Sequence, residues 1–388
     1  MAVTPSPGTL GATARCRPRH LCNVQRKACY ARYGPLEEAA QAALLCQTDR
    51  SGRNRPRPKE RDIAESVVWA RYIRRMSLSI RFLGTSAARP TVERNVTALA
   101  LAREGETLLF DCGEGTQRQM MRYGVGFTTA DIFFTHFHTD HLLGLIGLTR
   151  TMALQGRTET LRLYGPAGAL KALRACIAFG GERLTFPVEI AELDGSSVLE
   201  RKDYAIHAIE ADHHGAPALG YALVEKIRLG RFNAEMARAI GIPEGPLWGR
   251  LHRGESVTLP DGRHVEAASL VGQPRTGRRI VISGDTRPTD TLRSMAAHAD
   301  ILVHEATFGD DEAERAVETG HSTAREAATV ARDADVRRLI LTHFSARYSR
   351  DPGELVTQAQ SVFAPTVAAR DGLEIEIPFD AEVTSTPV

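Results

Sequence analysis

Alternation of apolar and polar side chains begins at Leu78 and marks the start of a folded domain. Leu78, Ile80 and Phe82 alternate with Ser79 and Arg81, the period expected of a half-buried strand. Short apolar runs bounded by polar residues, Gly or Pro predict eight further strands. These predicted strands span residues 97–103, 107–110, 131–134, 161–164, 220–224, 280–283, 301–304 and 339–342.

Helices are predicted between these strands. They cover residues 117–122, 142–152, 167–179, 323–333 and 353–363. Strand and helix alternate in the carboxyl half, whereas consecutive strands are commoner in the amino half. This pattern favours an α/β fold in which two packed sheets have helices on their outer faces.

Residues 1–75 differ from the rest of the chain in net charge and in cysteine content. They contain 15 Lys or Arg against 6 Asp or Glu, so the net charge of +2 for the whole chain hides a +9 segment and a −7 remainder. Their four cysteines fit no C-x2-C zinc pattern, and we predict a largely disordered extension. It is either a basic nucleic-acid arm, an extension without a role, or the product of a misplaced start, with Met76 the true first residue; we favour the last two readings.

Membrane and secretion signals are missing from the pattern. No apolar run approaches the roughly 18 residues of a membrane span, and no amino-terminal apolar stretch resembles a signal peptide. We therefore expect a cytoplasmic protein without a membrane partner.

Candidate metal chemistry is concentrated in the sequence T-H-F-H-T-D-H, directly after the predicted strand 131–134. In an extended chain, positions i and i+2 face the same way, so His136 and His138 can meet one metal ion. The turn beyond them directs Asp140 and His141 toward a second ion. A solvated His-rich loop is the alternative interpretation.

Further ligands must come from other strand ends, because one loop cannot complete a two-metal site. Asp285 and His343 each follow a predicted strand, where ligands gather in α/β proteins. The carboxylate of Asp285 is the best placed to bridge two cations. A last candidate, His214, belongs to the doublet His213–His214, and spacing alone does not separate these two residues.

Several segments together resemble ribonuclease Z, a metallo-β-lactamase-fold endonuclease that trims tRNA precursors. The matching segments, in chain order, are F-L-G-T-S-A-A-R-P-T (82–91), D-C-G-E-G-T-Q-R-Q (111–119), T-H-F-H-T-D-H-L-L-G-L (135–145), S-G-D-T-R (283–287), H-E-A-T-F (304–308), G-H-S-T (320–323) and L-T-H-F-S-A-R-Y (341–348). The resemblance covers residues 76 to about 378. It implies a metallo-β-lactamase-like αββα sandwich for residues 76–388.

The resemblance also implies a site with two Zn²⁺ per subunit, although Mn²⁺ and Fe²⁺ suit the same ligands. The implied ligands are His136, His138 and His214 for one ion, Asp140, His141 and His343 for the other, with Asp285 shared. His214 is preferred to His213 because the family's histidine lies six residues before the Gly of its G-Y pair, which is Gly220 here. The implied catalytic residues are Asp140, which accepts a proton from water, His321, which protonates the departing 3′ oxygen, and Glu305, which orients His321. Asp111 is expected to hydrogen-bond a ligand histidine. His321 at the start of a helix also fits a plain capping role.

Residues 226–253 resemble the arm with which this family grips tRNA, and they contain six Lys or Arg against two acidic residues. An ordinary surface insertion is the alternative. The candidate substrate-binding residues of this segment are Lys226, Arg228, Arg231, Arg238, Gly241, Pro243, Gly245 and Pro246.

The expected function is therefore cleavage of the 3′ trailer from precursor tRNA, which leaves a tRNA 3′-OH and a 5′-phosphorylated trailer. The family implies a homodimer, and no DNA partner is expected. Two alternatives stay open at this point. One is another hydrolase of the same fold, such as a small phosphodiesterase, arylsulfatase or lactonase, and the other is a non-catalytic RNA-binding member.

Overall fold

Two seven-stranded sheets form the body of the protein in a computed structural model, which describes residues 78–179 and 183–379. The first sheet has the order β16-β1-β2-β3-β4-β5-β6, and the second has the order β15-β14-β13-β12-β9-β8-β7. In each sheet a parallel half joins an antiparallel half, and the change of direction occurs at β3 and at β12.

The strands of the first sheet are β1 (Leu78–Gly84), β2 (Ala98–Arg103), β3 (Glu106–Phe110), β4 (Asp131–Phe133), β5 (Leu161–Gly165), β6 (Val188–Glu192) and β16 (Glu374–Glu376). Those of the second are β7 (Val198–Glu200), β8 (Tyr204–Glu210), β9 (Leu219–Glu225), β12 (Arg279–Ile282), β13 (Ile301–Glu305), β14 (Leu339–Thr342) and β15 (Thr366–Ala368).

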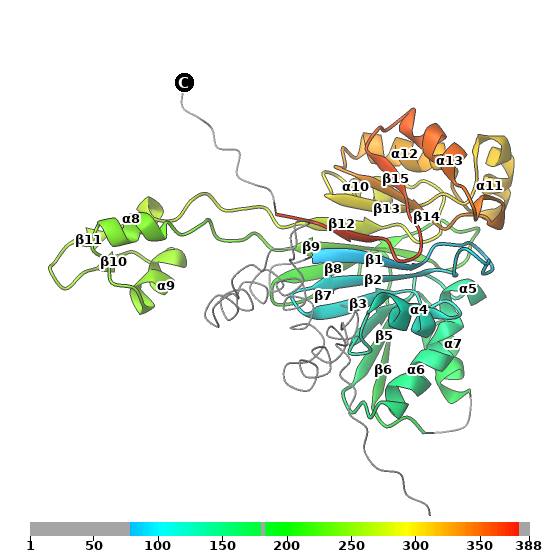
Figure 1. Cartoon of the computed structure of the whole chain (residues 1–388), viewed down its shortest axis with the longest axis horizontal. Coiled ribbons are helices and arrows are strands. Elements are labelled where there is room, and N and C mark those ends of the chain that lie inside the picture. The colour runs from blue at the N-terminus through cyan, green and yellow to red at the C-terminus, as the bar shows by residue number, and fades with distance from the viewer. Residues whose placement is uncertain (1–77, 180–182, 380–388) are drawn as a thin grey trace, which may run out of the picture. The chain divides into compact units, whose positions relative to one another are not determined.

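Helices cover the outer faces of both sheets (Figure 1). Beside the first sheet lie α4 (Thr116–Tyr123), α5 (Thr139–Leu142), α6 (Gly144–Leu154) and α7 (Ala169–Ala178). Beside the second lie α10 (Asp290–Met295), α11 (Ala313–Thr319), α12 (Ala324–Asp333) and α13 (Gly353–Gln360), with short 3-10 turns η2 (Asp310–Glu312) and η3 (Ala346–Tyr348). The predicted αββα sandwich is therefore confirmed.

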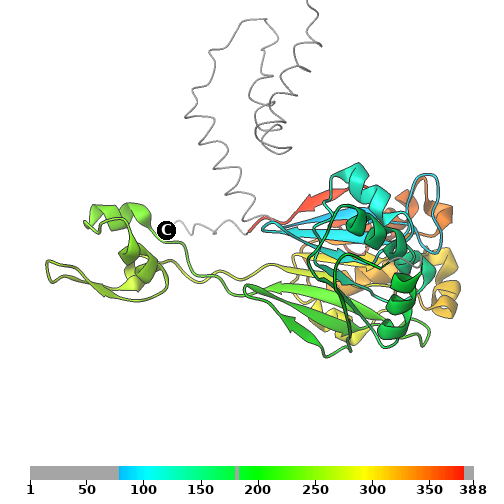
Figure 2. The ribbon, with the colours of Figure 1, turned by 90° about the horizontal axis from the view of Figure 1, so that it is seen from below.

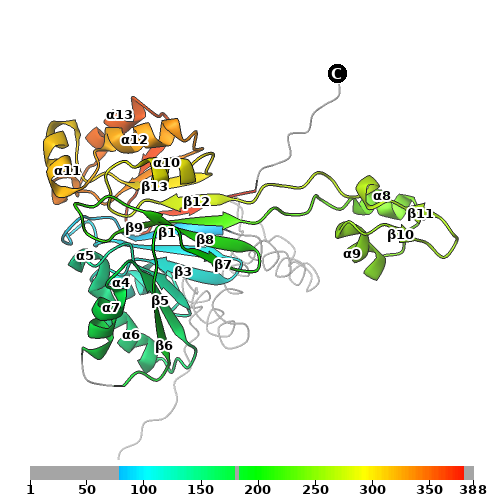
Figure 3. The ribbon, with the colours of Figure 1, turned by 180° about the vertical axis from the view of Figure 1, so that it is seen from behind.

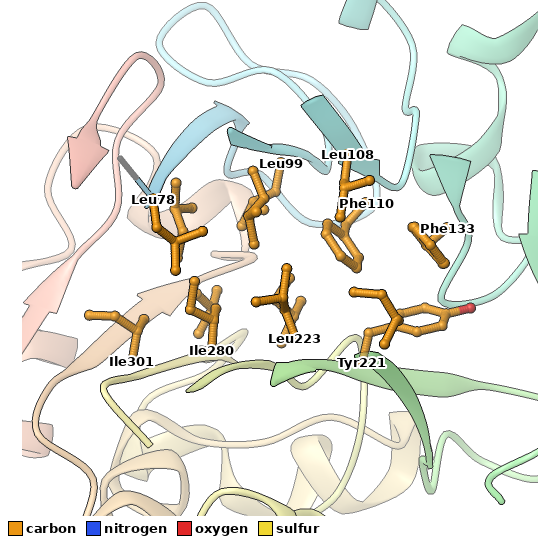
Figure 4. Close-up of a cluster of buried hydrophobic side chains, with 14 of the residues drawn as sticks. Leu78, Leu99, Leu108, Phe110, Phe133, Tyr221, Leu223, Ile280 and Ile301 are labelled. Carbon is orange, nitrogen blue, oxygen red and sulfur yellow. The ribbon is translucent and has the colours of Figure 1, made fainter. Parts of the chain in front are cut away.

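Apolar side chains from both sheets fill the space between them (Figure 4). Leu99 and Phe110 of the first sheet face Leu223 and Tyr221 of the second, and all four are buried. Tyr221 also donates its hydroxyl to the carbonyl oxygen of Phe134 at 2.7 Å. Because Phe134 leads into the His-rich loop, this bond ties the loop to the opposite sheet.

The predicted strands are all present, within one or two residues of their predicted ends. Within the two large sheets, the sequence pattern missed β6, β7, β8, β15 and β16. In β8 almost every position is buried, so its apolar residues do not alternate, and β16 has one apolar residue between two glutamates. The predicted helix 142–152 corresponds to α6, and only its first residue, Leu142, belongs to the preceding helix α5.

A small separate module is inserted between β9 and β12. It contains α8 (Ala234–Ala239), α9 (Pro246–His252), β10 (Val257–Thr258), β11 (His264–Val265) and the 3-10 turn η1 (Ala267–Ser269). Two chain segments connect it to the sheets and pair at Arg228–Arg275 and Phe232–Val271. Figures 1, 2 and 3 all show it standing away from the sandwich.

This module, which we call the arm, is longer than the predicted segment 226–253. Its buried apolar residues are Ala237, Ile242, Leu251, Val257, Leu259, Val265, Ala267 and Leu270. Five of these eight residues lie beyond Arg253, because the hairpin β10–β11 packs against the two helices. The arm therefore spans about residues 226–278.

Residues 1–75, with their predicted disorder and their four cysteines, lie outside the described residues. Within the part of the chain that is described, no helix combines the length and the apolar character needed to cross a membrane.

Candidate metal centre and active site

Four strand-to-loop junctions bring the candidate ligands together. The T-H-F-H-T-D-H segment runs from the end of β4 into α5, His213 follows β8, Asp285 follows β12, and His343 directly follows β14. Their donor atoms form overlapping groups in which every donor lies within 4.8 Å of the others. The structure thus gathers residues that are up to about 200 positions apart in the sequence.

Three histidines form the first group. His136 Nε2 lies 3.0 Å from His138 Nδ1, and His138 Nδ1 lies 3.2 Å from His213 Nε2. Donors held about 2.0–2.1 Å from one tetrahedral ion are separated by roughly 3.3 Å. These spacings are close to what one shared cation requires.

Asp140, His141 and His343 form the second group. His141 Nε2 and His343 Nε2 are 3.3 Å apart, and each lies within 3.5 Å of Asp140 Oδ2. Asp285 Oδ2 lies 3.3 Å from His141 Nε2, 3.2 Å from His343 Nε2 and 3.7 Å from His136 Nε2. One oxygen of Asp285 therefore lies near donors of both groups, so this carboxylate could be shared by two ions.

The structure corrects one ligand prediction, because His213 and not His214 belongs to the first group. His213 is buried, and its Nδ1 donates to the carbonyl oxygen of Gly320 at 2.9 Å. His214 is exposed and has a left-handed backbone with φ of 49°. Because the backbone turns at His214, the side chain that faces the other donors is that of His213. Counting six residues back from Gly220 therefore ends one residue too late in the chain.

The ring orientations fit metal binding. The Nδ1 atoms of four histidines already have partners: Thr135 Oγ1 for His136, Asp111 for His141, the Gly320 carbonyl for His213 and Thr307 Oγ1 for His343. Such bonds fix the tautomer and leave Nε2 free for an ion. The predicted bond from Asp111 to a candidate ligand histidine is confirmed, at 2.8 Å to His141.

Two threonines complete this support, and the sequence did not indicate either. Thr135 donates its backbone N–H to Asp111 Oδ1 at 2.7 Å and its hydroxyl to Asp111 Oδ2 at 2.8 Å. Thr307 donates its hydroxyl to Glu305 Oε2 at 2.7 Å while it accepts from His343. Threonine is too common a residue to be singled out without its tertiary partners.

Charges in the cluster balance one another. Burial alone would raise the pKa of Asp285, but His343 and His141 hold the pKa of that carboxyl well below its usual value. Burial opposes charge on His141 as well, yet Asp285 and Asp111 keep the pKa of its ring well above normal. A proton on His141 thus offsets the neighbouring carboxylates, and a divalent ion that binds to this ring must displace it.

His321 lies beside both candidate metal positions. Its Nδ1 is 2.8 Å from Glu305 Oε1 and 4.0 Å from Asp285 Oδ2, and its ring lies against that of His343. Burial lowers the pKa of His321, but the Glu305 carboxylate outweighs this and raises it to about 9. The capping alternative is wrong, because the side chains of Thr323 and Glu326 cap α12.

Two hollows of opposite charge flank the cluster. A cavity of about 470 Å³ is lined by Asp140, Asp285 and His321 together with Arg89, Arg315 and Arg347. On the His213 side lies an open cleft of about 890 Å³ lined by Asp194, Glu210 and Asp212. Of the two hollows, the first is therefore the better suited to an anionic ligand.

The predicted substrate-binding residues of the arm have mostly structural partners. Arg238 Nε lies 2.7 Å from Glu244 Oε1, and Lys226 Nζ lies 2.8 Å from Glu200 Oε2. Arg228 covers the ring of Phe379. Gly241, Pro243 and Gly245 lie in the turn between α8 and α9, and Pro246 is the first residue of α9. Fewer positive charges of the arm are therefore available for a ligand than its sequence indicates.

Comparisons with known proteins agree with this geometry. A family model described as "Beta-lactamase superfamily domain" matches residues 251–344, and one described as "Anti-Pycsar protein Apyc1" matches residues 78–227. The short form of human tRNase Z has a similar structure, with a TM-score of 0.56 and 28% identity over 78% of this chain and all of that chain.

Curated relatives give the family directly. A ribonuclease Z from Gemmatimonas aurantiaca is 63% identical over 313 residues, which cover 80% of this chain and all of that protein. A ribonuclease Z from Myxococcus xanthus is 56% identical over 302 residues, 78% of this chain and 98% of that protein. With the fold and the clustered donors in agreement, the chain belongs to the ribonuclease Z family.

Proposed function

We propose that this protein, a metal-dependent endoribonuclease, removes the 3′ trailer of precursor tRNA with the help of two zinc ions. The observation that carries the proposal is the pair of donor groups that share Asp285, with His321 beside them. Two adjacent divalent ions supply positive charge to a phosphodiester and lower the pKa of water. The remaining steps fall to side chains.

Asp140 and His321 divide the proton transfers. Asp140 is anchored by a 2.7 Å bond from the Ala88 backbone N–H to its Oδ2, and it accepts the proton of the attacking water. His321, kept protonated by Glu305, donates a proton to the departing 3′ oxygen. A P–O bond to water forms and the P–O3′ bond breaks, which leaves a tRNA 3′-OH and a trailer with a 5′ phosphate.

Substrate binding is assigned to two separate surfaces. Arg89, Arg315 and Arg347 line the cavity beside the metal donors and are suited to the phosphates around the scissile bond. The arm has nine Lys or Arg and five Asp or Glu between residues 226 and 278, and we assign it to the tRNA body. Because many of its charges are paired, it fits recognition by shape better than by bulk charge.

Other parts of the expectation stay predictions of the family resemblance: zinc as the metal, a homodimer, a cytoplasmic location and the absence of a DNA partner. No observation favours a lactonase or arylsulfatase. A non-catalytic role conflicts with the complete set of donors.

The test is cleavage of a precursor tRNA that carries a 3′ trailer, followed by analysis of both new ends. We expect one cut with a 3′-OH and a 5′ phosphate, and no cut by an Asp285→Ala variant. A lactone and an aryl sulfate are the comparison substrates. Rapid turnover of either one without cleavage of the precursor would refute the proposal.

A further inference from the structure

Arg287 joins the turn that carries Asp285 to the loop that carries His321. Its Nη1 donates to the backbone carbonyl of His321 at 2.5 Å and to Glu326 Oε2 at 2.8 Å. Its Nη2 donates to the other oxygen of Glu326. The guanidinium therefore holds both the backbone of His321 and the helix that follows it.

The partner of Arg287 is itself fixed. Glu326 is the third residue of α12 and accepts from the backbone N–H of Thr323 at 2.9 Å, while the Thr323 hydroxyl caps the backbone N–H of Glu326. This reciprocal capping makes Glu326 a rigid acceptor. A bidentate arginine–carboxylate pair adds directional strength that a lysine cannot supply.

Other bonds tie the same three loops together. The Arg287 backbone N–H donates to the Asp212 carbonyl at 2.8 Å, and the Ser322 hydroxyl donates to the Thr286 carbonyl at 2.6 Å. At Gly320, φ is 71° and a Cβ would lie 2.5 Å from the backbone nitrogen of His214. Only glycine allows this approach, which lets His213 bond to the Gly320 carbonyl.

We propose that Arg287 is a positioning residue for His321. By holding the backbone carbonyl of His321, it sets the position of the imidazole relative to the scissile bond. This inference rests on the proposed function, in which His321 protonates the 3′ leaving oxygen. Glu305 fixes the rotation of the ring through Nδ1, whereas Arg287 fixes the position of the backbone from which the ring extends. Neither bond substitutes for the other.

The decisive experiment uses a leaving group that needs no proton. Arg287→Met is compared with the parent on precursor tRNA and on the same RNA with sulfur in place of the scissile 3′ oxygen. We expect kcat on the oxygen substrate to fall roughly 10- to 100-fold, the scale of a misplaced catalytic group. KM, metal content and kcat on the sulfur substrate should stay near the parent values.

Arg325→Met is the matched control. Arg325 precedes Glu326 on α12 and pairs with exposed Asp310 at 2.7 Å. The Arg325→Met variant therefore lacks an ion pair of the same helix but keeps the bonds of Arg287 to the His321 loop. Its kcat should be unchanged. Arg287→Lys keeps the charge but loses the bidentate geometry, so its kcat on the oxygen substrate should lie between those of Arg287→Met and the parent.

Three outcomes overturn the assignment. An equal loss on oxygen and sulfur substrates would mean that Arg287 acts on the metal loop, and unchanged kcat on both would mean that it positions nothing. A further loss when Arg287→Met is added to His321→Ala would show that it does not act through His321. Failure of the proposed role of His321 is distinguished separately, because His321→Ala would then lose the same activity on both substrates.

Discussion

The metal centre and the arm hold their charged residues in opposite ways. At the centre, buried carboxylates and imidazoles are each fixed by specific partners, such as the Thr135–Asp111–His141 chain. In the arm, ion pairs such as Arg250–Glu255 and Arg263–Asp261 are about half exposed. Buried networks define geometry, whereas exposed pairs contribute little stability and are screened by salt. The geometry of the metal-donor cluster therefore tolerates less change than the charges of the arm.

The largest expected effect separates two adjacent histidines. His213→Ala should lose bound metal and lower precursor cleavage by more than about 10²-fold, because even residues that only support a ligand are worth 10–100-fold. His214→Ala, the matched control, should keep both properties, since its side chain is exposed. Metal content per chain and single-turnover cleavage are the measurements. The opposite result would restore His214 as the ligand.

A loss confined to turnover is expected at His321, whose replacement by Ala should keep metal but reduce kcat by roughly 10²–10⁴. Because Glu305 raises the pKa of His321 to about 9, the ring stays protonated up to that pH, and activity should fall as the pH rises through about 9. Glu305→Gln removes the charge that raises this pKa, so the alkaline fall should move to lower pH. A pH profile of kcat checks this, and an unmoved alkaline limb in the Gln variant contradicts it.

Replacement of the arm by a short Gly/Ser linker should reduce the cleavage of precursor tRNA but not that of small phosphodiesters. Since the arm has its own core and supplies no metal donor, cleavage of bis-p-nitrophenyl phosphate should survive. The kcat/KM for precursor tRNA should fall on the order of 10²-fold, mainly through KM, as expected when uniform binding is lost. If the folded variant binds and cuts precursor tRNA like the parent, the arm assignment fails.

The smallest effect concerns a single exposed pair. Glu244→Gln removes the partner of Arg238 and one negative charge, so tRNA affinity should rise by about two- to fivefold and depend more steeply on salt. Glu318→Gln, which removes one charge from α11 in the sandwich, is the comparison. Weaker binding by the Glu244 variant would show that the pair positions Arg238 for the RNA.

Prediction from sequence succeeded where chemistry was local. His136, His138, Asp140 and His141 lie within six residues after an apolar strand, so their convergence needs only the geometry of one loop. The inward member of the His213–His214 doublet depends on a left-handed turn at His214. Spacing does not encode that turn.

Features set by distant partners were out of reach. Arg287 looks like any surface arginine until Glu326 and the His321 carbonyl are placed beside it. The full length of the arm was missed because the apolar residues of its second half are scattered among polar residues and glycines, and only their packing on α8 and α9 shows that they form a core. The pairing of its arginines with glutamates was hidden for the same reason.

The order of the strands also bears on how the enzyme is made. One edge of β1 stays unpaired until β16 has been made, almost 300 residues later. The donors of the second group likewise extend from Asp140 to His343. At about 5–20 residues per second, a ribosome needs roughly 10 to 40 seconds to add the chain between them. Until His343 emerges, the second donor group is incomplete. If the proposed function holds, the ribosome, which is itself rich in RNA, therefore meets a complete nuclease site only after residue 343 has been added.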